Sequence, residues 1–160
     1  MISIIGKRRI SVDLNIPIEI ALNGTNKKEA KKFFDLMKSY PTRLELFLSP
    51  HFTKITPNIK KLLDKYGVKR GNRHKYYIYL YERDFNTEKI HKFASSANVN
   101  QEDVYFFIGS FLMNCDYIVT FNLKQCNKLT EIKNTGWCYG IEVPDIISVP
   151  TFLHLMKFLL

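Results

Sequence analysis

The sequence predicts an α/β protein with a central, mainly parallel sheet flanked by helices. Short apolar runs alternate along the chain with longer segments whose apolar residues recur every three or four positions. Asn, Pro and Gly residues, which start and stop helices, separate the two kinds of segment. Strands that alternate with helices are joined by helical crossovers, and this arrangement is typical of a parallel sheet covered on both faces.

The predicted strands are short and mostly apolar. In chain order they are Ile2 to Ile5, Ile10 to Val12, Leu44 to Leu48, Tyr76 to Tyr81, Tyr117 to Phe121 and Ile146 to Val149. In the fourth of them Tyr77, Tyr79 and Tyr81 alternate with other residues, which is the period of a strand with one buried face.

Capping residues and prolines mark the predicted helices. These run from Asn15 to about Asn23-Gly24, from Asn26 to Tyr40-Pro41, from Ser49-Pro50 with a restart at Thr56-Pro57, from Thr87 to Ala97, from Asn100 to Leu112, and from Pro150 onward. Asn26 and Glu29 have the spacing of a capping box, and Gly67 is the expected C-terminal cap of the helix before it. Residues 123 to 140 are expected to form a loop or a short helix.

Each longer helix has one apolar face that is expected to enter the core. The clearest faces are Ala30, Phe33, Phe34 and Met37; Ile90, Phe93, Ala94 and Ala97; and Val104, Phe107, Ile108, Phe111 and Leu112. A chain of 160 residues without a visible repeat or linker is expected to form one domain, residues 1–160.

The composition points to a polyanionic partner. A formal net charge of +9 favours nucleic acid or an acidic protein, although a Lys-rich solvated surface gives the same charge.

The three cysteines lack CxxC spacing and indicate neither a disulfide framework nor a zinc cluster. The apolar stretch 104 to 121 is interrupted by Asn114 and Asp116, so we expect no membrane span. The apolar lead before the first basic residues is too short for a signal peptide, so a cytoplasmic location is predicted.

Two carboxylates are predicted at positions where ligands bind in parallel sheets. Asp13 follows the strand that ends at Val12, and Asp103 opens the apolar helix before the strand that ends at Thr120-Phe121-Asn122. Ligands of parallel α/β sheets bind beside the carboxyl ends of strands, so these residues can form a divalent-metal site. The alternatives are that Asp13 caps a turn or helix, and that Asp103 only complements a helix dipole.

Four segments, in order along the chain, resemble the PIN domain family. VDLNIP, with Asp13 and Asn15, is similar to the family's first strand, and the segment from Asp103 to Thr120 is similar to its late helix and strand. VTFNLKQ at 119 to 125 and GIEVPDIISVPTFL at 140 to 153 resemble its later motifs. The resemblance implies a PIN-like three-layer sandwich and a Mg- or Mn-dependent endoribonuclease, as in VapC-like toxins of toxin–antitoxin pairs.

The resemblance implies that Asp13 and Asp103 are metal ligands and that Asn122 joins them as a catalytic residue. The acidic cluster is incomplete, because the family's second acid is replaced within Lys54 to Thr56 and its fourth by Gln125. With fewer charges we expect Mg or Mn to be bound weakly.

Other carboxylates are poor replacements for the missing acids. Asp116 precedes its strand and should lie at the opposite end of the sheet. Glu19 and Glu45 are possible stand-ins that are expected to face solvent.

A basic and aromatic segment is a candidate contact for nucleic acid. Lys69, Arg70, Arg73 and Lys75 precede a run of tyrosines, and this combination suits single-stranded RNA. The alternative is a charged turn before a strand whose tyrosines enter the core.

Two functional hypotheses follow. The first is a PIN-type ribonuclease that acts on RNA, and the second is a catalytically inactive PIN-like module that binds RNA or a protein partner. A protein antitoxin and a homodimer are possible partners, and a DNA-binding regulator lacks a helix-turn-helix signal.

Overall fold

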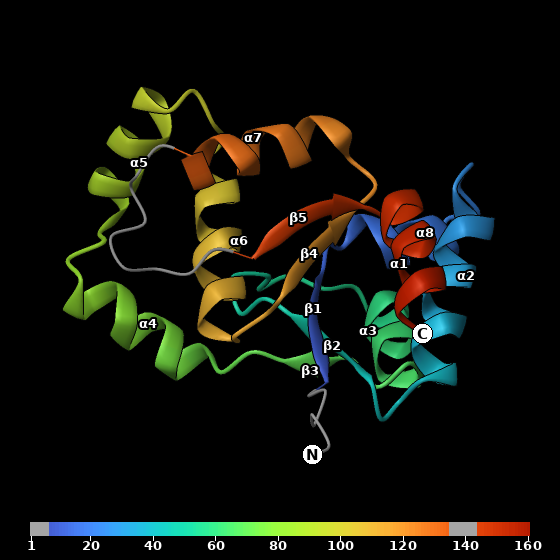
Figure 1. Ribbon diagram of the computed structural model, residues 1–160. Coiled ribbons are helices and arrows are strands. Elements are labelled where there is room, and N and C mark those ends of the chain that lie inside the picture. The colour runs from blue at the N-terminus through green and yellow to red at the C-terminus, as the bar shows by residue number, and fades with distance from the viewer. Residues whose placement is uncertain (1–6, 135–143) are drawn as a thin grey trace, which may run out of the picture.

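Parallel strands form one sheet at the centre of the molecule in the computed structural model, which describes residues 7–134 and 144–160 (Figure 1). Within these residues five strands pair in the order β3-β2-β1-β4-β5. The strands are β1 (Arg8–Val12), β2 (Leu44–Leu48), β3 (Lys69–Arg70), β4 (Tyr117–Thr120) and β5 (Asp145–Ser148). Every pair is parallel, so the predicted α/β class and parallel sheet are confirmed.

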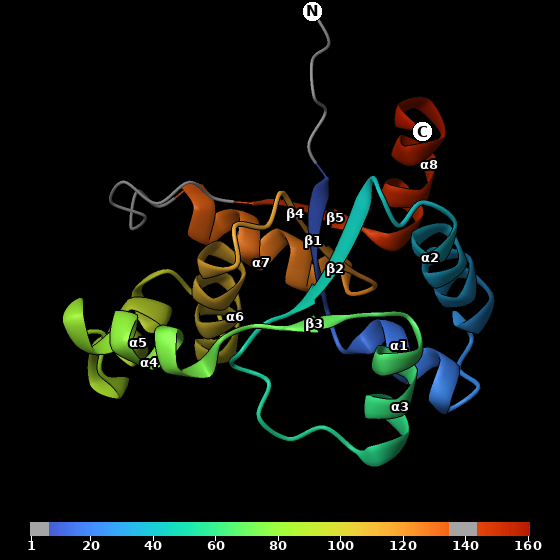
Figure 2. The ribbon, with the colours of Figure 1, turned by 90° about the horizontal axis from the view of Figure 1, so that it is seen from below.

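The helices connect the strands. They are α1 (Asn15–Ala21), α2 (Lys27–Ser39), α3 (Pro57–Lys65), α4 (Arg73–Glu82), α5 (Thr87–Ser96), α6 (Gln101–Leu112), α7 (Leu123–Asn134) and α8 (Val149–Leu159). Figure 2, seen from below, shows α1, α2, α3 and α8 on one side of the sheet and α4 to α7 on the other. The result is a three-layer sandwich.

Adjacent residues of β4 show how the sheet separates two hydrophobic cores. Val119 packs with Phe33 and Phe34 of α2, whereas Ile118 packs with Phe107 of α6. All five side chains are fully buried. Because successive strand residues point to opposite faces, a central strand must be apolar at every position, which explains the uninterrupted apolar runs in the sequence.

The order of the strands places a topological switch between β1 and β4. From β1 the chain adds β2 and β3 on one side, and β4 and β5 on the other. Val12 pairs with Val119, so both strands end at the same level of the sheet. In open parallel sheets the carboxyl ends of strands at such a switch are where ligands bind.

The strand predicted over Tyr76 to Tyr81 is wrong, because this segment belongs to helix α4. Asn72 caps the helix, since its side-chain oxygen accepts a 3.0 Å hydrogen bond from the backbone N–H of Lys75. Tyr76 is buried, whereas Tyr77 and Tyr81 are 53% and 87% exposed. Tyrosine suits either structure, and here the cap and the burial of one helical face override the alternation.

Two smaller predictions also need correction. No helix starts at Ser49-Pro50, because residues 49–56 form a turn and an irregular segment before α3 begins at Pro57. Asn26 makes no capping hydrogen bond, since its side-chain amide donates to Glu19 over 3.2 Å instead. For the segment 123–140, expected to be a loop or a short helix, the helix is confirmed over Leu123–Asn134, and residues 135–140 lie outside the described residues. The predicted strand Ile2 to Ile5 lies outside the described residues.

Several local signals are confirmed. Thr56 caps α3 and Asn100 caps α6 through their side-chain oxygens. Gly67 has a φ of +68°, the left-handed conformation that glycine adopts readily after a helix. None of the helices within the described ranges combines the length and the hydrophobicity that crossing a bilayer requires.

Candidate active site

Asp13 and Asp103 are separated by 90 positions in the chain and lie at the same end of the sheet. Asp13 follows β1, and its backbone N–H donates a 3.1 Å hydrogen bond to the carbonyl of Val119 in β4. Asp103 lies in the first turn of α6. The two residues are only 6% and 8% exposed, and the charge of Asp103 acts on Asp13.

A hydrogen-bonded frame holds Asp13 between β1 and β4. The hydroxyl of Thr120 donates to Oδ2 of Asp13 over 2.9 Å. The side-chain amide of Asn15 donates to the Thr120 hydroxyl oxygen over 2.9 Å and to Asp13 Oδ2 over 3.3 Å. The amide oxygen of Asn15 accepts from the backbone N–H of Phe121 over 3.3 Å. The Asp-x-Asn spacing of the sequence therefore ties the ends of two neighbouring strands together.

The start of α7 links this frame to Asp103. The backbone N–H of Asn122 donates to the Thr120 hydroxyl over 3.1 Å, and the side-chain oxygen of Asn122 accepts from the backbone N–H of Gln125 over 3.1 Å. The side-chain amide of Gln125 then donates to Oδ1 of Asp103 over 3.1 Å. A continuous set of hydrogen bonds thus runs from Asp13 to Asp103.

In the structure Asn122 caps the beginning of α7. Its side-chain oxygen is engaged by Gln125 in the geometry of a helix cap, and the residue is exposed. The side chain that reaches a carboxylate is that of Gln125, which is neutral. The catalytic role of Asn122 stays a prediction.

Burial raises the pKa of both carboxyl groups. The pKa of Asp13 rises from 3.8 to about 6, because desolvation and the nearby charge of Asp103 outweigh the hydrogen bonds from Thr120 and the backbone N–H groups. Desolvation also raises the pKa of Asp103, although the hydrogen bond from Gln125 opposes it. Two buried carboxyl groups in one place resist ionisation unless a cation compensates their charge.

Cys126 also lies at this end of the sheet and was not expected there. Burial and the charge of Asp13 raise the pKa of its thiol to about 11. Neither the spacing of the cysteines nor any motif marks this residue, because its proximity to Asp13 comes from the packing of α7. A neutral thiol adds no negative charge to the site.

The carboxylate oxygens at this end of the sheet suit a hard divalent cation, although few charged side chains are present. Asp13 and Asp103 offer carboxylate oxygens, which Mg²⁺ and Mn²⁺ prefer. Within residues 7–134 and 144–160 no group of three or more His, Cys, Asp or Glu side chains is arranged to hold a metal. Asp13 and Asp103 supply two carboxylates, which is fewer than such a group has.

The carboxylates weighed as substitutes are engaged elsewhere. Asp116 accepts a 2.8 Å hydrogen bond from the backbone N–H of Arg9 near the beginning of β1, at the other end of the strand from Asp13. Glu45 forms an ion pair with Lys69 over 2.9 Å, and its side chain is 14% exposed. Glu19 accepts hydrogen bonds from Asn26.

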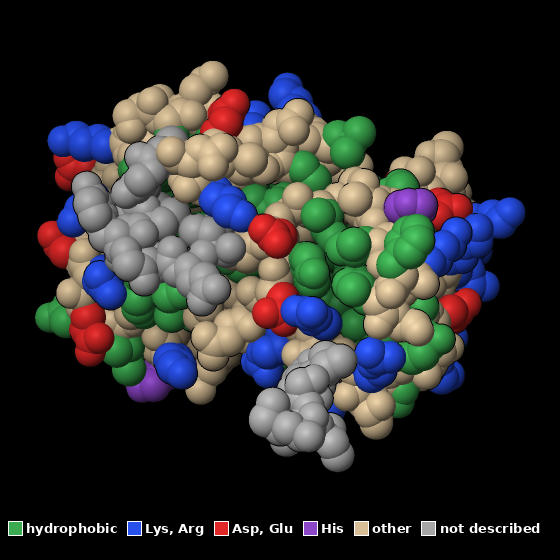
Figure 3. Space-filling view, viewed as in Figure 1, with side chains coloured by type: hydrophobic (Ala, Val, Ile, Leu, Met, Phe, Trp, Pro, Cys, Tyr) green, Lys and Arg blue, Asp and Glu red, His purple; other side chains and the backbone are tan. Residues whose placement is uncertain are grey.

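The basic residues predicted to contact nucleic acid are exposed, but most have protein partners. Lys69 pairs with Glu45, as described above. The guanidinium groups of Arg70 and Arg73 donate to the carbonyls of Phe52 and Thr53 over 3.1 and 3.4 Å. Lys75 has no ion pair among the described residues. Figure 3 shows that the Lys and Arg side chains on the face of Figure 1 are spread out rather than gathered in one cluster.

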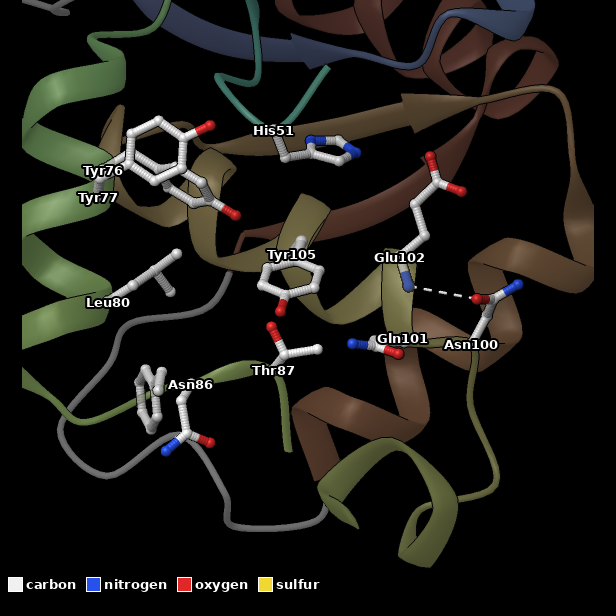
Figure 4. A pocket seen from close by; sticks show the side chains of 11 residues that line it. His51, Tyr76, Tyr77, Leu80, Asn86, Thr87, Asn100, Gln101, Glu102 and Tyr105 are labelled. Carbon is white, nitrogen blue, oxygen red and sulfur yellow. Dashed lines mark hydrogen bonds between the residues drawn. The ribbon is translucent and has the colours of Figure 1, made fainter. Parts of the chain in front are cut away.

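A pocket of about 690 Å³ lies between α4 and the first turns of α6. Residues 100–102, which precede Asp103, line one side, and α4 lines the other (Figure 4). His51 also lines it, with its Nδ1 2.7 Å from the hydroxyl of Ser49. Burial lowers the pKa of His51 to about 3, so the ring is neutral at pH 7. Sequence reasoning missed His51, because a single histidine in an irregular segment carries no motif.

Comparisons of this chain with protein-family models, curated proteins and solved structures found no match.

Proposed function

We propose that this chain is a PIN-type, metal-dependent endoribonuclease in which Asp13 and Asp103 hold Mg²⁺ or Mn²⁺. The observation that carries the proposal is the position of these buried carboxylates beside β1 and β4, where the order of the strands reverses. The resemblance of VDLNIP and of residues 103 to 125 to the family supports it. RNA as the partner and a cytoplasmic location belong to the same proposal.

In this proposal some residues bind the metal ion and others orient the residues that bind it. A bound divalent cation lowers the pKa of a coordinated water and neutralises charge that develops on a phosphate. Asp13 and Asp103 hold the ion, and Thr120 and Asn15 orient Asp13. Gln125 orients Asp103. With two carboxylates the affinity for the ion is low, because the number of charged ligands sets binding strength at such sites.

One observation favours the second candidate, a non-catalytic module that binds RNA or a protein. A neutral amide, that of Gln125, bonds to Asp103 where a further carboxylate would strengthen a metal site. A protein antitoxin or a second copy of the chain is the possible protein partner.

The test compares cleavage of single-stranded RNA in Mn²⁺ by the wild type and by the variants Asp13→Asn and Asp103→Asn. Both substitutions should abolish cleavage. The matched control is Asp116→Asn, which changes a carboxylate at the other end of the sheet and should keep full activity.

Cleavage that survives both substitutions contradicts the proposal, as does a wild type that cleaves no RNA. A wild type that binds RNA without cleaving it, with or without Mn²⁺, supports the non-catalytic module instead.

A further inference from the structure

The pocket beside α6 differs from the acidic site in its chemistry, because aromatic and amide side chains line it. Tyr76, Tyr77 and Leu80 come from α4, Phe85 from the following turn, and Tyr105 from α6. Figure 4 shows Tyr76, Tyr77, Leu80 and Tyr105 around one space, with His51 at the top and Asn86 at the bottom. We propose that this pocket binds an unpaired nucleobase of single-stranded RNA whose backbone passes the Asp13–Asp103 site.

The size and the walls of the pocket suit a flat ring with polar edges. A volume of about 690 Å³ lies within the usual range for small-molecule sites. Aromatic side chains stack on any base, since every base has a π-face. Tyr77 is 53% exposed, so its ring can be reached from solvent. The walls therefore bind a base mainly through stacking.

Polar groups lie at the end of the pocket nearest the carboxylates. Asn100, Gln101 and Glu102 line it, and Glu102 is bonded directly to Asp103 in the chain. The charge of Glu102 acts on Asp103, so the polar end of the pocket lies near the acidic site. A nucleotide whose base is in the pocket can thus place its phosphate toward Asp103. Amide and carboxylate groups are the partners that bases use for hydrogen bonds.

His51 contributes a ring nitrogen without a partner. Its Nδ1 pairs with Ser49, whereas its Nε2 is buried and has no hydrogen-bond partner among the described residues. The ring stacks on Phe106, with centroids 5.0 Å apart, which fixes its orientation at the pocket. His51 therefore adds a fixed ring to the lining of the pocket.

The choice of RNA over a protein ligand follows from the surroundings of the pocket. Arg73 and Lys75 lie on the first turn of α4, the helix that also carries Tyr76 and Tyr77. The chain has a net charge of +9. Positive charge next to stacking residues is the combination by which proteins bind single strands. A base in a duplex cannot enter the pocket without unpairing, so single strands are favoured.

The inference rests on the proposed function, and its test measures binding rather than cleavage. Fluorescence anisotropy in EDTA would compare a short single-stranded RNA with a set in which one nucleotide at a time is abasic. At one position the abasic RNA should bind the wild type about 10-fold more weakly, as expected for the loss of one stacked base. Tyr77→Ala should weaken binding of intact RNA by a similar factor and remove the effect of the abasic position.

Tyr81→Ala is the matched control, because Tyr81 is on the same helix and 87% exposed but does not line the pocket. It should bind both RNAs like the wild type. Tyr105→Ala gives a second test from the opposite wall, and thermal unfolding of each variant checks that the fold is kept.

The outcomes separate the two proposals. If the wild type binds and cleaves RNA but no abasic position matters, the base pocket is refuted and the ribonuclease proposal stands. If the wild type binds no RNA, both fail. Equal binding of duplex and single strand, or a free nucleoside monophosphate that binds more tightly than RNA, also overturns the assignment to an RNA base.

Discussion

The side-chain amide of Gln125, at the start of α7, donates a 3.1 Å hydrogen bond to the Asp103 carboxylate of α6. A neutral donor here keeps the negative charge of the site low. Changing Gln125 to Glu replaces the donor with a third carboxylate of nearly the same shape. We expect this change to tighten Mn²⁺ binding by about 10-fold or more, because added charged ligands strengthen such sites.

Isothermal titration calorimetry with Mn²⁺ measures the effect of Gln125→Glu. The control Gln101→Glu adds the same charge in the first turn of α6, at a residue that has no hydrogen bond to Asp103 in the structure. Equal affinity in Gln125→Glu and the wild type would show that these side chains do not share a cation.

Asp13→Asn is expected to stabilise the metal-free protein at pH 8. The pKa of Asp13 is raised in the fold from 3.8 to about 6, so its stabilising contribution is full below pH 3.8 and is lost as the pH rises through 6. The difference corresponds to about 3 kcal/mol at most. Urea unfolding in EDTA at pH 8 and at pH 4 should show a gain for the variant only at pH 8.

In the presence of Mn²⁺ the wild type should become more stable to unfolding than Asp13→Asn, the reverse of their order in EDTA. The ion binds the folded wild type and raises its free energy of unfolding, whereas the variant has lost a ligand. A wild type that remains less stable than the variant in saturating Mn²⁺ would argue against Asp13 as a ligand.

Lys75 and Lys69 should differ in their effect on RNA binding, although both are exposed. Lys69 is held by Glu45 at 2.9 Å, whereas Lys75 has no ion pair among the described residues. We expect Lys75→Ala to reduce the slope of log affinity against log salt concentration by about one, and Lys69→Ala to leave it nearly unchanged. Anisotropy titrations over a range of KCl concentrations test this, and equal slopes for the two variants would contradict it.

His51 should make the fold sensitive to acid. Its pKa falls from 6.5 to about 3 on folding because burial disfavours the charged ring. Its stabilising contribution is therefore complete above pH 6.5 and is lost as the pH falls toward 3. Between pH 7.5 and 4.5 the loss amounts to up to about 3 kcal/mol.

Replacing His51 by Asn should remove this part of the pH dependence. Denaturant unfolding at several pH values compares this variant with the wild type and with His74→Asn, in which an exposed histidine is changed. A wild type and a His51→Asn variant that lose the same stability between pH 7.5 and 4.5 would contradict the prediction.

Gly109 lets α6 approach the turn after β2. A Cβ atom at this position would overlap the hydroxyl of Ser49 and lie 3.1 Å from Cδ of Pro50. Gly109→Ala is therefore expected to destabilise the fold by about 1–3 kcal/mol, the usual cost of overpacking a core. Denaturant unfolding measures it, and the double variant Ser49→Ala/Gly109→Ala should lose less than the sum of the single changes. If the two losses of stability simply add, the Ser49 side chain is not what the new Cβ atom clashes with.

Periodicity and capping signals in the sequence were enough to predict the fold class and the positions of Asp13 and Asp103. Apolar runs and helix caps are set by residues close together in the chain, so they can be recognised in the sequence. The strand Leu44 to Leu48 was predicted with its observed bounds, and Asn100 was correctly predicted to cap its helix. The position of Asp116 at the wrong end of the sheet followed from strand geometry in the same way.

Only the tertiary structure decided which side chains meet. The tyrosines of α4 suit a strand or a helix, and packing of Tyr76 beside α6 selects the helix. The bond from Gln125 to Asp103, the thiol of Cys126 near Asp13 and the imidazole of His51 at the pocket each join residues from different elements. Such contacts depend on how helices dock on the sheet, which no short stretch of sequence encodes.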